Sequence, residues 1–209
     1  MDEPATPFDP SQFNDPLAEQ VAWGPLEEGG APFRTHYYKA VNSNRIEFRA
    51  TGRSNLFAGL FVILGVFVGL MYLSAVLAPG IVSADLGQNM VGLISLVFFG
   101  AALGMLYIDH EPIVFDKERG WYWKGRRGPH RVASLDELES CAELAEVHAL
   151  QLVAETLQRR RRWFLSFELN LVLKSGERVN VVDHGDLDTL RYDTKRLADF
   201  LGVPVWDVV

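Results

Sequence analysis

Apolar and polar residues follow three different patterns along the chain. Two long apolar runs, 56–78 and 90–108, contain no Asp, Glu, Lys, Arg or His. Shorter β-prone segments lie before and after these runs, and those at 146–155 and 163–173 alternate between apolar and polar residues with a period of two, which is typical of β-strands. Near the end of the chain, from 187 to 201, apolar residues recur at helical spacing. The patterns therefore predict an α+β chain in which strands surround two apolar helices and a helix follows the last strand.

The two uncharged runs have the length of membrane-spanning helices. A bilayer core of about 30 Å is crossed by roughly 20 helical residues. Segment 55–109 is therefore predicted to be a transmembrane hairpin with spans 56–78 and 90–108. Lys and Arg residues lie close to its two outer ends and are absent from the connecting loop, so the positive-inside rule places both termini in the cytoplasm. The sequence thus predicts a multi-pass membrane protein with the lipid bilayer as a partner.

Each predicted span carries two glycines four residues apart. They are Gly65 and Gly69 in the first span, and Gly100 and Gly104 in the second. Pairs of this kind allow two helix backbones to approach each other closely. Three interpretations stay open, namely a seam between two copies in a homodimer, packing of the two helices within one hairpin, and the ordinary use of glycine in membrane helices.

Strands are predicted on both sides of the hairpin. Segment 34–54 contains two β-prone runs around an Asn-Ser-Asn turn, which predicts a juxtamembrane β-hairpin. In segment 163–173, five apolar residues share one face and polar residues the other, which indicates a strand with one buried face. Further strands are predicted at 113–116, 121–124, 146–155 and 178–183, with a short helix or turn at 134–144.

The final helix has clear start and stop signals. Asp186 is the predicted N-cap, and Gly202 followed by Pro204 ends the helix. Leu190, Leu197 and their neighbours form an apolar stripe. Strands followed by one amphipathic helix predict a small curved antiparallel sheet covered by that helix, over residues 110–209.

Three segments carry a resemblance to a known family. They are 167–173 (Phe-Glu-Leu-Asn-Leu-Val-Leu), 176–178 (Gly-Glu-Arg) and 197–206, which ends in Pro-Val-Trp. In this order they resemble the bacterial PH-like (pleckstrin-homology-type) domain proteins of the inner membrane. The resemblance implies a cytosolic PH-like antiparallel sheet with a C-terminal amphipathic helix, held at the bacterial inner membrane. It also implies binding of lipids, peptides or proteins rather than catalysis, and it assigns no catalytic residue.

The excess negative charge of the chain is confined to its beginning. The formal net charge is −7, and residues 1–33 carry seven acidic residues and no Lys or Arg: Asp2, Glu3, Asp9, Asp15, Glu19, Glu27 and Glu28. This segment is also rich in Pro and lacks periodic apolar residues, which predicts a disordered acidic tail. An acidic balance disfavours nucleic acid as a partner, because phosphate neutralisation needs a concentrated basic face.

Two short motifs are candidates for chemistry. Arg159, Arg160, Arg161 and Arg162 lie between two predicted strands, where such a loop either contacts anionic lipid headgroups or is simply solvated. His184 lies among three acidic residues, which suits either a metal or acid–base site or, at lower cost, a turn and helix cap. One cysteine, Cys141, offers no disulfide within the chain. No metal site and no cofactor are predicted.

These observations favour a binding protein over an enzyme. The expected function is a membrane-anchored PH-like scaffold or accessory module that binds a protein partner at the cytoplasmic face. Two alternatives stay open. One is a regulator that responds to anionic lipid through the arginine loop, and the other is a subunit of an oligomeric transport assembly built through the glycine faces.

Overall fold

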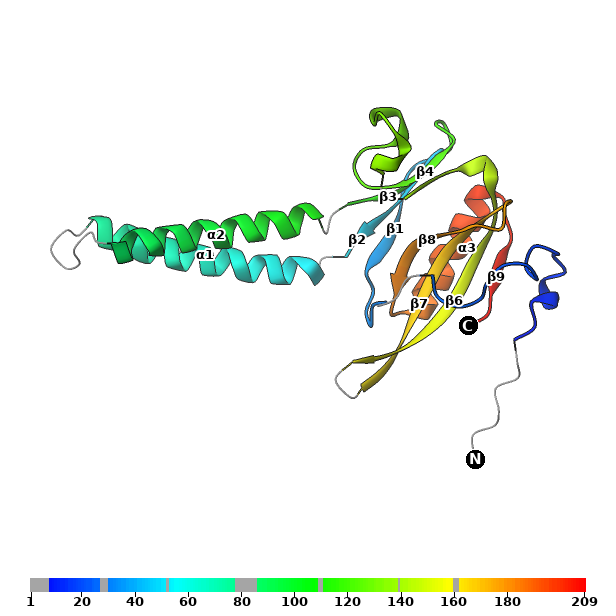
Figure 1. Ribbon diagram of the computed structural model, residues 1–209, viewed down its shortest axis with the longest axis horizontal. Helices are drawn as coiled ribbons and strands as arrows, with labels where there is room; N and C mark the ends of the chain where they lie inside the picture. The colour runs from blue at the N-terminus through cyan, green and yellow to red at the C-terminus, as the bar shows by residue number, and fades with distance from the viewer. Residues whose placement is uncertain are drawn as a thin grey trace. The chain divides into compact units, whose positions relative to one another are not determined.

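The computed structural model describes residues 8–26, 30–51, 53–77, 86–108, 111–138, 140–159 and 162–209 (Figure 1). The chain forms two compact units, one made of Met1–Arg49 with Pro112–Val209 and the other of Ala50–Glu111. The second unit lies inside the sequence of the first, so the two helices that it contains are an insertion between two strands.

The elements of the first unit are mostly strands. The helices are α1 (Arg53–Leu77) and α2 (Leu86–Ile108) in the inserted unit, and α3 (Leu187–Leu201) near the C-terminus. The strands are β1 (His36–Asn42), β2 (Arg45–Ala50), β3 (Ile113–Asp116), β4 (Trp121–Lys124), β5 (Cys141–Glu143), β6 (Val147–Arg159), β7 (Arg162–Leu173), β8 (Arg178–His184) and β9 (Val205–Asp207). Short 3-10 turns are η1 (Pro10–Phe13), η2 (Pro129–Arg131), η3 (Leu135–Glu137) and η4 (Leu144–Glu146).

The first sheet joins the strands that precede the inserted helices to those that follow them. Its order is β1-β2-β3-β4-β5, and β2 pairs with β3 in antiparallel fashion, with Arg45 opposite Asp116 and Phe48 opposite Ile113. The predicted hairpin at 34–54 is therefore part of the same sheet as the later strands. The predicted helix or turn at 134–144 is replaced by η3 and by β5, which pairs with β4.

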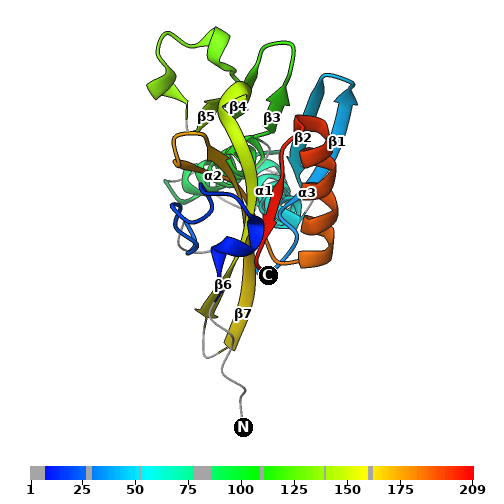
Figure 2. The same ribbon diagram turned by 90° about the vertical axis from the view of Figure 1, so that its right-hand side faces the viewer.

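The second sheet has the order β8-β7-β6-β9. Strands β6 and β7 form a long antiparallel hairpin, whereas β9 runs parallel to β6, with Leu150 opposite Val205 (Figure 2). The expectation of one wholly antiparallel sheet is therefore wrong, since there are two sheets and one parallel pair. Strand β9 arises because the chain turns after α3 at Gly202, which has the left-handed φ of 77°, and then runs back beside β6.

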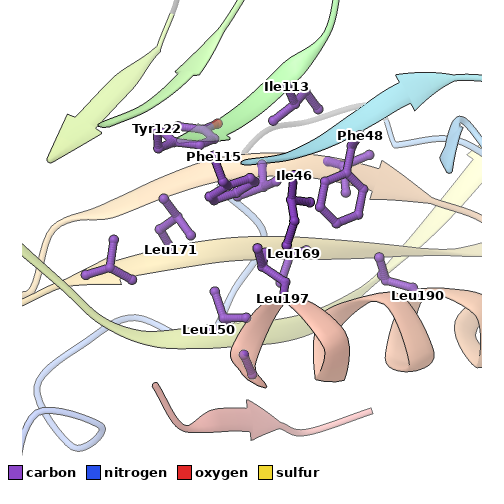
Figure 3. Packing of buried hydrophobic residues seen from close by; sticks show 14 of the residues in the cluster. Ile46, Phe48, Ile113, Phe115, Tyr122, Leu150, Leu169, Leu171, Leu190 and Leu197 are labelled. Carbon is purple, nitrogen blue, oxygen red and sulfur yellow. The ribbon is translucent and has the colours of Figure 1, made fainter. Parts of the chain in front are cut away.

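The core of the first unit lies where the two sheets and α3 meet (Figure 3). Its buried side chains include Phe48 and Phe115 from the first sheet, Leu150 and Leu169 from the second, and Leu197 from α3. Helix α3 begins as predicted, because the Asp186 carboxylate accepts a hydrogen bond from the Thr189 main-chain N–H. The helix buries its predicted apolar stripe, including Leu190 and Leu197, against the apolar faces of the two sheets.

The inserted helices correct the prediction of a membrane protein. Taking the chain only as far as the structure describes it, no helix is both long enough and apolar enough to cross a membrane. The predictions of spans 56–78 and 90–108, of a multi-pass protein and of a place in the bacterial inner membrane with both termini cytoplasmic are contradicted. The fold class is α+β.

Candidate functional site

The predicted arginine loop falls largely outside the described residues. Arg160 and Arg161 are not among the described residues, and the side chains of Arg159 and Arg162 are not described either. The backbones of Arg159 and Arg162 face each other as the last pair of the β6–β7 ladder, so the loop connects two paired strands as expected. Next to it, the side chain of Trp163 is 67% exposed.

The four glycines of the inserted helices have different surroundings. A Cβ placed on Gly65 would lie 3.2 Å from the Phe99 ring, and one on Gly69 would lie 2.9 Å from the Ser95 hydroxyl. The Ser95 hydroxyl also donates a 2.8 Å hydrogen bond to the Gly65 carbonyl oxygen. For Gly100 and Gly104, no described atom lies within 4 Å of such a Cβ. The first pair thus lies at the contact between α1 and α2, whereas the second pair has no such contact with any described atom.

Many apolar side chains of α1 and α2 are exposed in the single chain. Among the most exposed are Ile63, Phe67, Leu96, Val97 and Leu103. Apolar patches of this kind are uncommon on monomeric proteins in water.

The predicted disordered tail is ordered over much of its length. Residues 8–26, which we call the N-terminal segment, lie against the outer face of the second sheet (Figure 2). Ala18 and Val21 are buried against Ala149, Val172 and Trp206. The expectation of disorder failed because these few apolar residues have no regular period, so their contacts with residues more than a hundred positions later leave no local signal.

A row of polar side chains lies on this covered face. Gln151 is on β6, and Ser166, Glu168 and Asn170 follow on β7. All four are buried. The alternation in 163–173 was interpreted as one buried and one polar face, and the structure shows that polar face covered as well. A buried charged or polar group is costly unless it is hydrogen-bonded, so this row requires partners.

The polar row receives those partners from main-chain atoms of the N-terminal segment. The Leu26 N–H donates to both carboxylate oxygens of Glu168, at 2.9 and 3.0 Å. The Gln151 amide donates to the Ala22 carbonyl oxygen at 3.0 Å. The Arg178 guanidinium, on the neighbouring strand β8, donates to the Gly24 carbonyl oxygen at 2.7 Å. Three side chains of the sheet therefore bind the backbone of every second residue from Ala22 to Leu26.

Two further polar atoms of the row lack a hydrogen-bond partner among the described residues. They are the Ser166 hydroxyl oxygen and the Asn170 Oδ1 oxygen. The Asn170 amide nitrogen donates to Glu168 at 2.5 Å. Gly30 lies close above Ser166, since a Cβ on Gly30 would overlap the serine side chain. The row thus has more hydrogen-bonding capacity than the N-terminal segment uses.

Apolar contacts hold the other half of the N-terminal segment. The Trp23 ring stacks on Phe13 at 5.4 Å between centroids and lies 5.9 Å from the Trp206 ring. At the border, His148 Nε2 lies 2.7 Å from Asp15 Oδ2. Burial raises the pKa of Asp15, but hydrogen bonds from His148 and the Leu17 main chain outweigh it and leave the pKa below its ordinary value. The segment is therefore held by backbone recognition at one end and by aromatic packing at the other.

Residues 30–36 contact the end of β8 and the turn after it, where the predicted histidine motif around His184 lies. The Gly185 N–H donates to the Phe33 carbonyl oxygen at 2.9 Å, and the Thr35 hydroxyl donates to the Asp183 carbonyl oxygen. His184 Nδ1 accepts a hydrogen bond from the Asp186 N–H, so this histidine helps to shape the turn before α3. In the described part of the chain, no three His, Cys, Asp or Glu side chains are placed to hold a metal ion.

The lowered pKa values of His36 and His184 predict a loss of stability in acid. Burial, with the charges of Lys124 and His184, lowers the pKa of His36 to about 4, and burial also lowers the pKa of His184. The unfolded chain binds a proton near pH 6.5, so the free energy of unfolding should be constant above pH 7 and fall between about pH 6.5 and 4. His36 alone should contribute a loss of about 3 kcal/mol. Urea unfolding at pH 7.5 and pH 4.5 measures it.

His36→Gln is the control for this acid effect. The difference in unfolding free energy between the two pH values should be smaller in this variant than in the natural chain. The pKa of Asp193 is raised by burial, which acts in the opposite direction, and this contribution cancels in the comparison because both chains contain it. An equal pH difference in the two chains would contradict the assignment to His36.

Side chains of the second sheet hydrogen-bond main-chain amides and carbonyls of the N-terminal segment, and His184 accepts a hydrogen bond within the turn before α3. Comparisons with family models, with curated proteins and with solved structures found no match to this chain. The resemblance to PH-like domain proteins therefore stays a prediction.

Proposed function

We propose that the protein is a binding module, of the scaffold or accessory type, that takes up an extended peptide segment of a protein partner on its second sheet. The N-terminal segment occupies this face in the isolated chain. One observation carries the proposal: the hydrogen bonds described between residues 22–26 and the side chains of Glu168, Gln151 and Arg178 all use main-chain atoms of the segment. Main-chain atoms are common to all peptides, so a segment with a different sequence can make the same hydrogen bonds.

Side-chain selection on this face comes from its apolar end. Trp206 packs in one cluster with Ala149 and Val172, at the place where Ala18 and Val21 are buried. A partner segment therefore needs small apolar residues here and an aromatic residue in the place of Trp23. Such aromatic anchors commonly supply much of the binding energy of an interface. The acidic Asp15 beside His148 favours a negatively charged residue at the border.

The test uses the full chain and a labelled peptide with the sequence of residues 8–26. Trp23→Ala removes the aromatic anchor of the resident segment and leaves the sheet unchanged. We expect this variant to bind the peptide at least about tenfold more tightly than the natural chain does, because the resident segment competes less well. Fluorescence polarisation measures the binding.

Two further variants make the test specific. Trp23→Ala combined with Glu168→Gln should bind the peptide about tenfold less tightly than Trp23→Ala alone, since Glu168 accepts two main-chain hydrogen bonds. Tyr192→Ala changes an exposed ring on α3 and should leave peptide binding unchanged. Failure of Trp23→Ala to bind the peptide, or indifference of that binding to Glu168, would refute the proposal.

A further inference from the structure

Two buried carboxylates mark the outer face of the first sheet. Glu47 on β2 is 5% exposed, and Asp116 at the end of β3 is 4% exposed. Buried carboxylates are retained as ions only with cationic partners. Three guanidinium groups supply that role here, from Arg45, Arg49 and Arg119. We call these five residues the arginine face.

The contacts within the arginine face are short. Arg45 bridges both carboxylates, at 2.8 Å to Glu47 and 3.3 Å to Asp116. Arg49 lies 2.7 Å from the second oxygen of Glu47, and Arg119 lies 3.0 Å from Asp116. Arg45, Glu47 and Arg49 are alternate residues of one strand and so share one side of the sheet. The Arg119 main-chain N–H also donates to Asp116, which fixes the turn that carries Arg119.

These ion pairs leave positive charge in excess. Three cations meet two carboxylates, and both Arg49 and Arg119 have side chains more than 40% exposed. The pKa of the neighbouring His130 lies below its ordinary value, first because of slight desolvation and then because of the positive charges of Arg119 and Arg131. An anion arriving at this face therefore meets an attractive field.

An aromatic floor lies beneath the same groups. The guanidinium carbon of Arg45 is 5.5 Å from the centroid of the Trp123 ring, and His130 stands edge-on to that ring at 6.3 Å. Trp123 is buried, and its indole N–H has no acceptor among the described residues. Carboxylates on one side and an aromatic ring on the other thus hold Arg45 in one orientation.

We propose that the arginine face binds a phosphate-bearing ligand. Guanidinium groups match the oxygens of a phosphate group in pairs, and they bind best when their geometry is set before the ligand arrives. Glu47 and Asp116 set that geometry. Arg49 and Arg119 each keep N–H groups that the described ion pairs do not use, and Arg131 adds charge at the rim. Free phosphate esters and lipid headgroups share this chemistry.

The test is a titration of the full chain with inorganic pyrophosphate at low salt, followed by calorimetry and by the NMR signal of the His130 ring. We expect saturable binding and a rise in the pKa of His130, since a bound dianion replaces net positive charge with negative charge. Arg119→Gln should weaken binding about tenfold, because it removes one guanidinium fork. Asp116 keeps Arg45 in this variant, so the fold is preserved.

A matched control and a second ligand complete the design. Arg191→Gln removes a guanidinium of similar exposure that pairs with Asp207 on another part of the unit, and it should leave pyrophosphate binding unchanged. Dihexanoyl phosphatidate, kept below its micelle concentration, tests the headgroup source. Binding of this lipid alone would assign the face to lipid headgroups, and binding of both ligands would show that the phosphate group suffices. Absence of saturable binding of either ligand, or equal losses in both variants, would overturn the proposal.

Discussion

Replacing Gly185 by alanine is expected to lower the free energy of unfolding by about 3 kcal/mol, near the upper end for overpacking a well-filled site. A Cβ at this position would lie closer than 3.0 Å to the Phe33 nitrogen and to the Pro32 carbonyl carbon. Those atoms belong to the main chain, so no side-chain rotation relieves the overlap. Either residues 31–33 move away from β8 or the turn before α3 shifts, and each movement breaks the hydrogen bond from Gly185 to Phe33.

Urea unfolding followed by tryptophan fluorescence measures this effect, and limited proteolysis shows whether residues 30–35 have detached. Gly24→Ala is the matched control, because no described atom lies within 4 Å of a Cβ built on Gly24. The control should change stability by no more than about 0.5 kcal/mol. If Gly185→Ala proved as stable as the control, the close approach of the two chain segments would be refuted.

Trp206→Ala is expected to cost about 3 to 5 kcal/mol, the usual loss for removing a large buried aromatic side chain. Trp206 is 1% exposed on β9 and touches both the second sheet and the N-terminal segment. The rings of Phe13, Trp23 and His148 all lie within about 6 Å of it. The variant leaves a cavity in this cluster, and the resident segment loses its anchor.

Trp163→Ala provides the comparison for this loss, because Trp163 is a tryptophan of the same sheet that is mostly exposed. We expect a change within about 0.5 kcal/mol for it. Trp206→Ala should also raise the rate of proteolysis within residues 8–26, and Trp163→Ala should not. Equal stability losses in the two variants would contradict the central place of Trp206 in the second core cluster.

The strands were predictable where β-prone runs flank a turn signal or alternate with a period of two. The bounds of β3 and β4 match the prediction, and β8 differs by one residue. The three-residue strands β5 and β9 gave no such signal, because a period of two cannot be recognised in so few residues. Strand β9 also pairs with β6 in parallel across a helix, and nothing in the composition of Val205–Asp207 indicates that partner.

The candidate site was less accessible to sequence reasoning than the strands were. The alternation in the sequence placed Ser166, Glu168 and Asn170 on one polar face of the strand. A polar face is ordinarily solvated, so nothing indicated that this one is covered. Its cover comes from residues 8–26, whose Pro content and acidic charge favoured disorder. The arginine face shows the same limit, since the pairing of Arg45 with Asp116 depends on the register of two strands that lie on opposite sides of the inserted helices.

The pairing of β2 with β3 across an inserted helical unit constrains the order of events during synthesis. A chain emerging from the ribosome presents β1 and β2 long before β3 has been made. The N-terminal segment is without its binding face for longer still, because β6, β7 and β9 come later in the sequence. Asp15 is separated from His148 by 133 positions. Contacts this distant form slowly. The N-terminal segment thus gains its cover only after β6, β7 and β9 have been made, and until then it stays open to chaperones or to other chains.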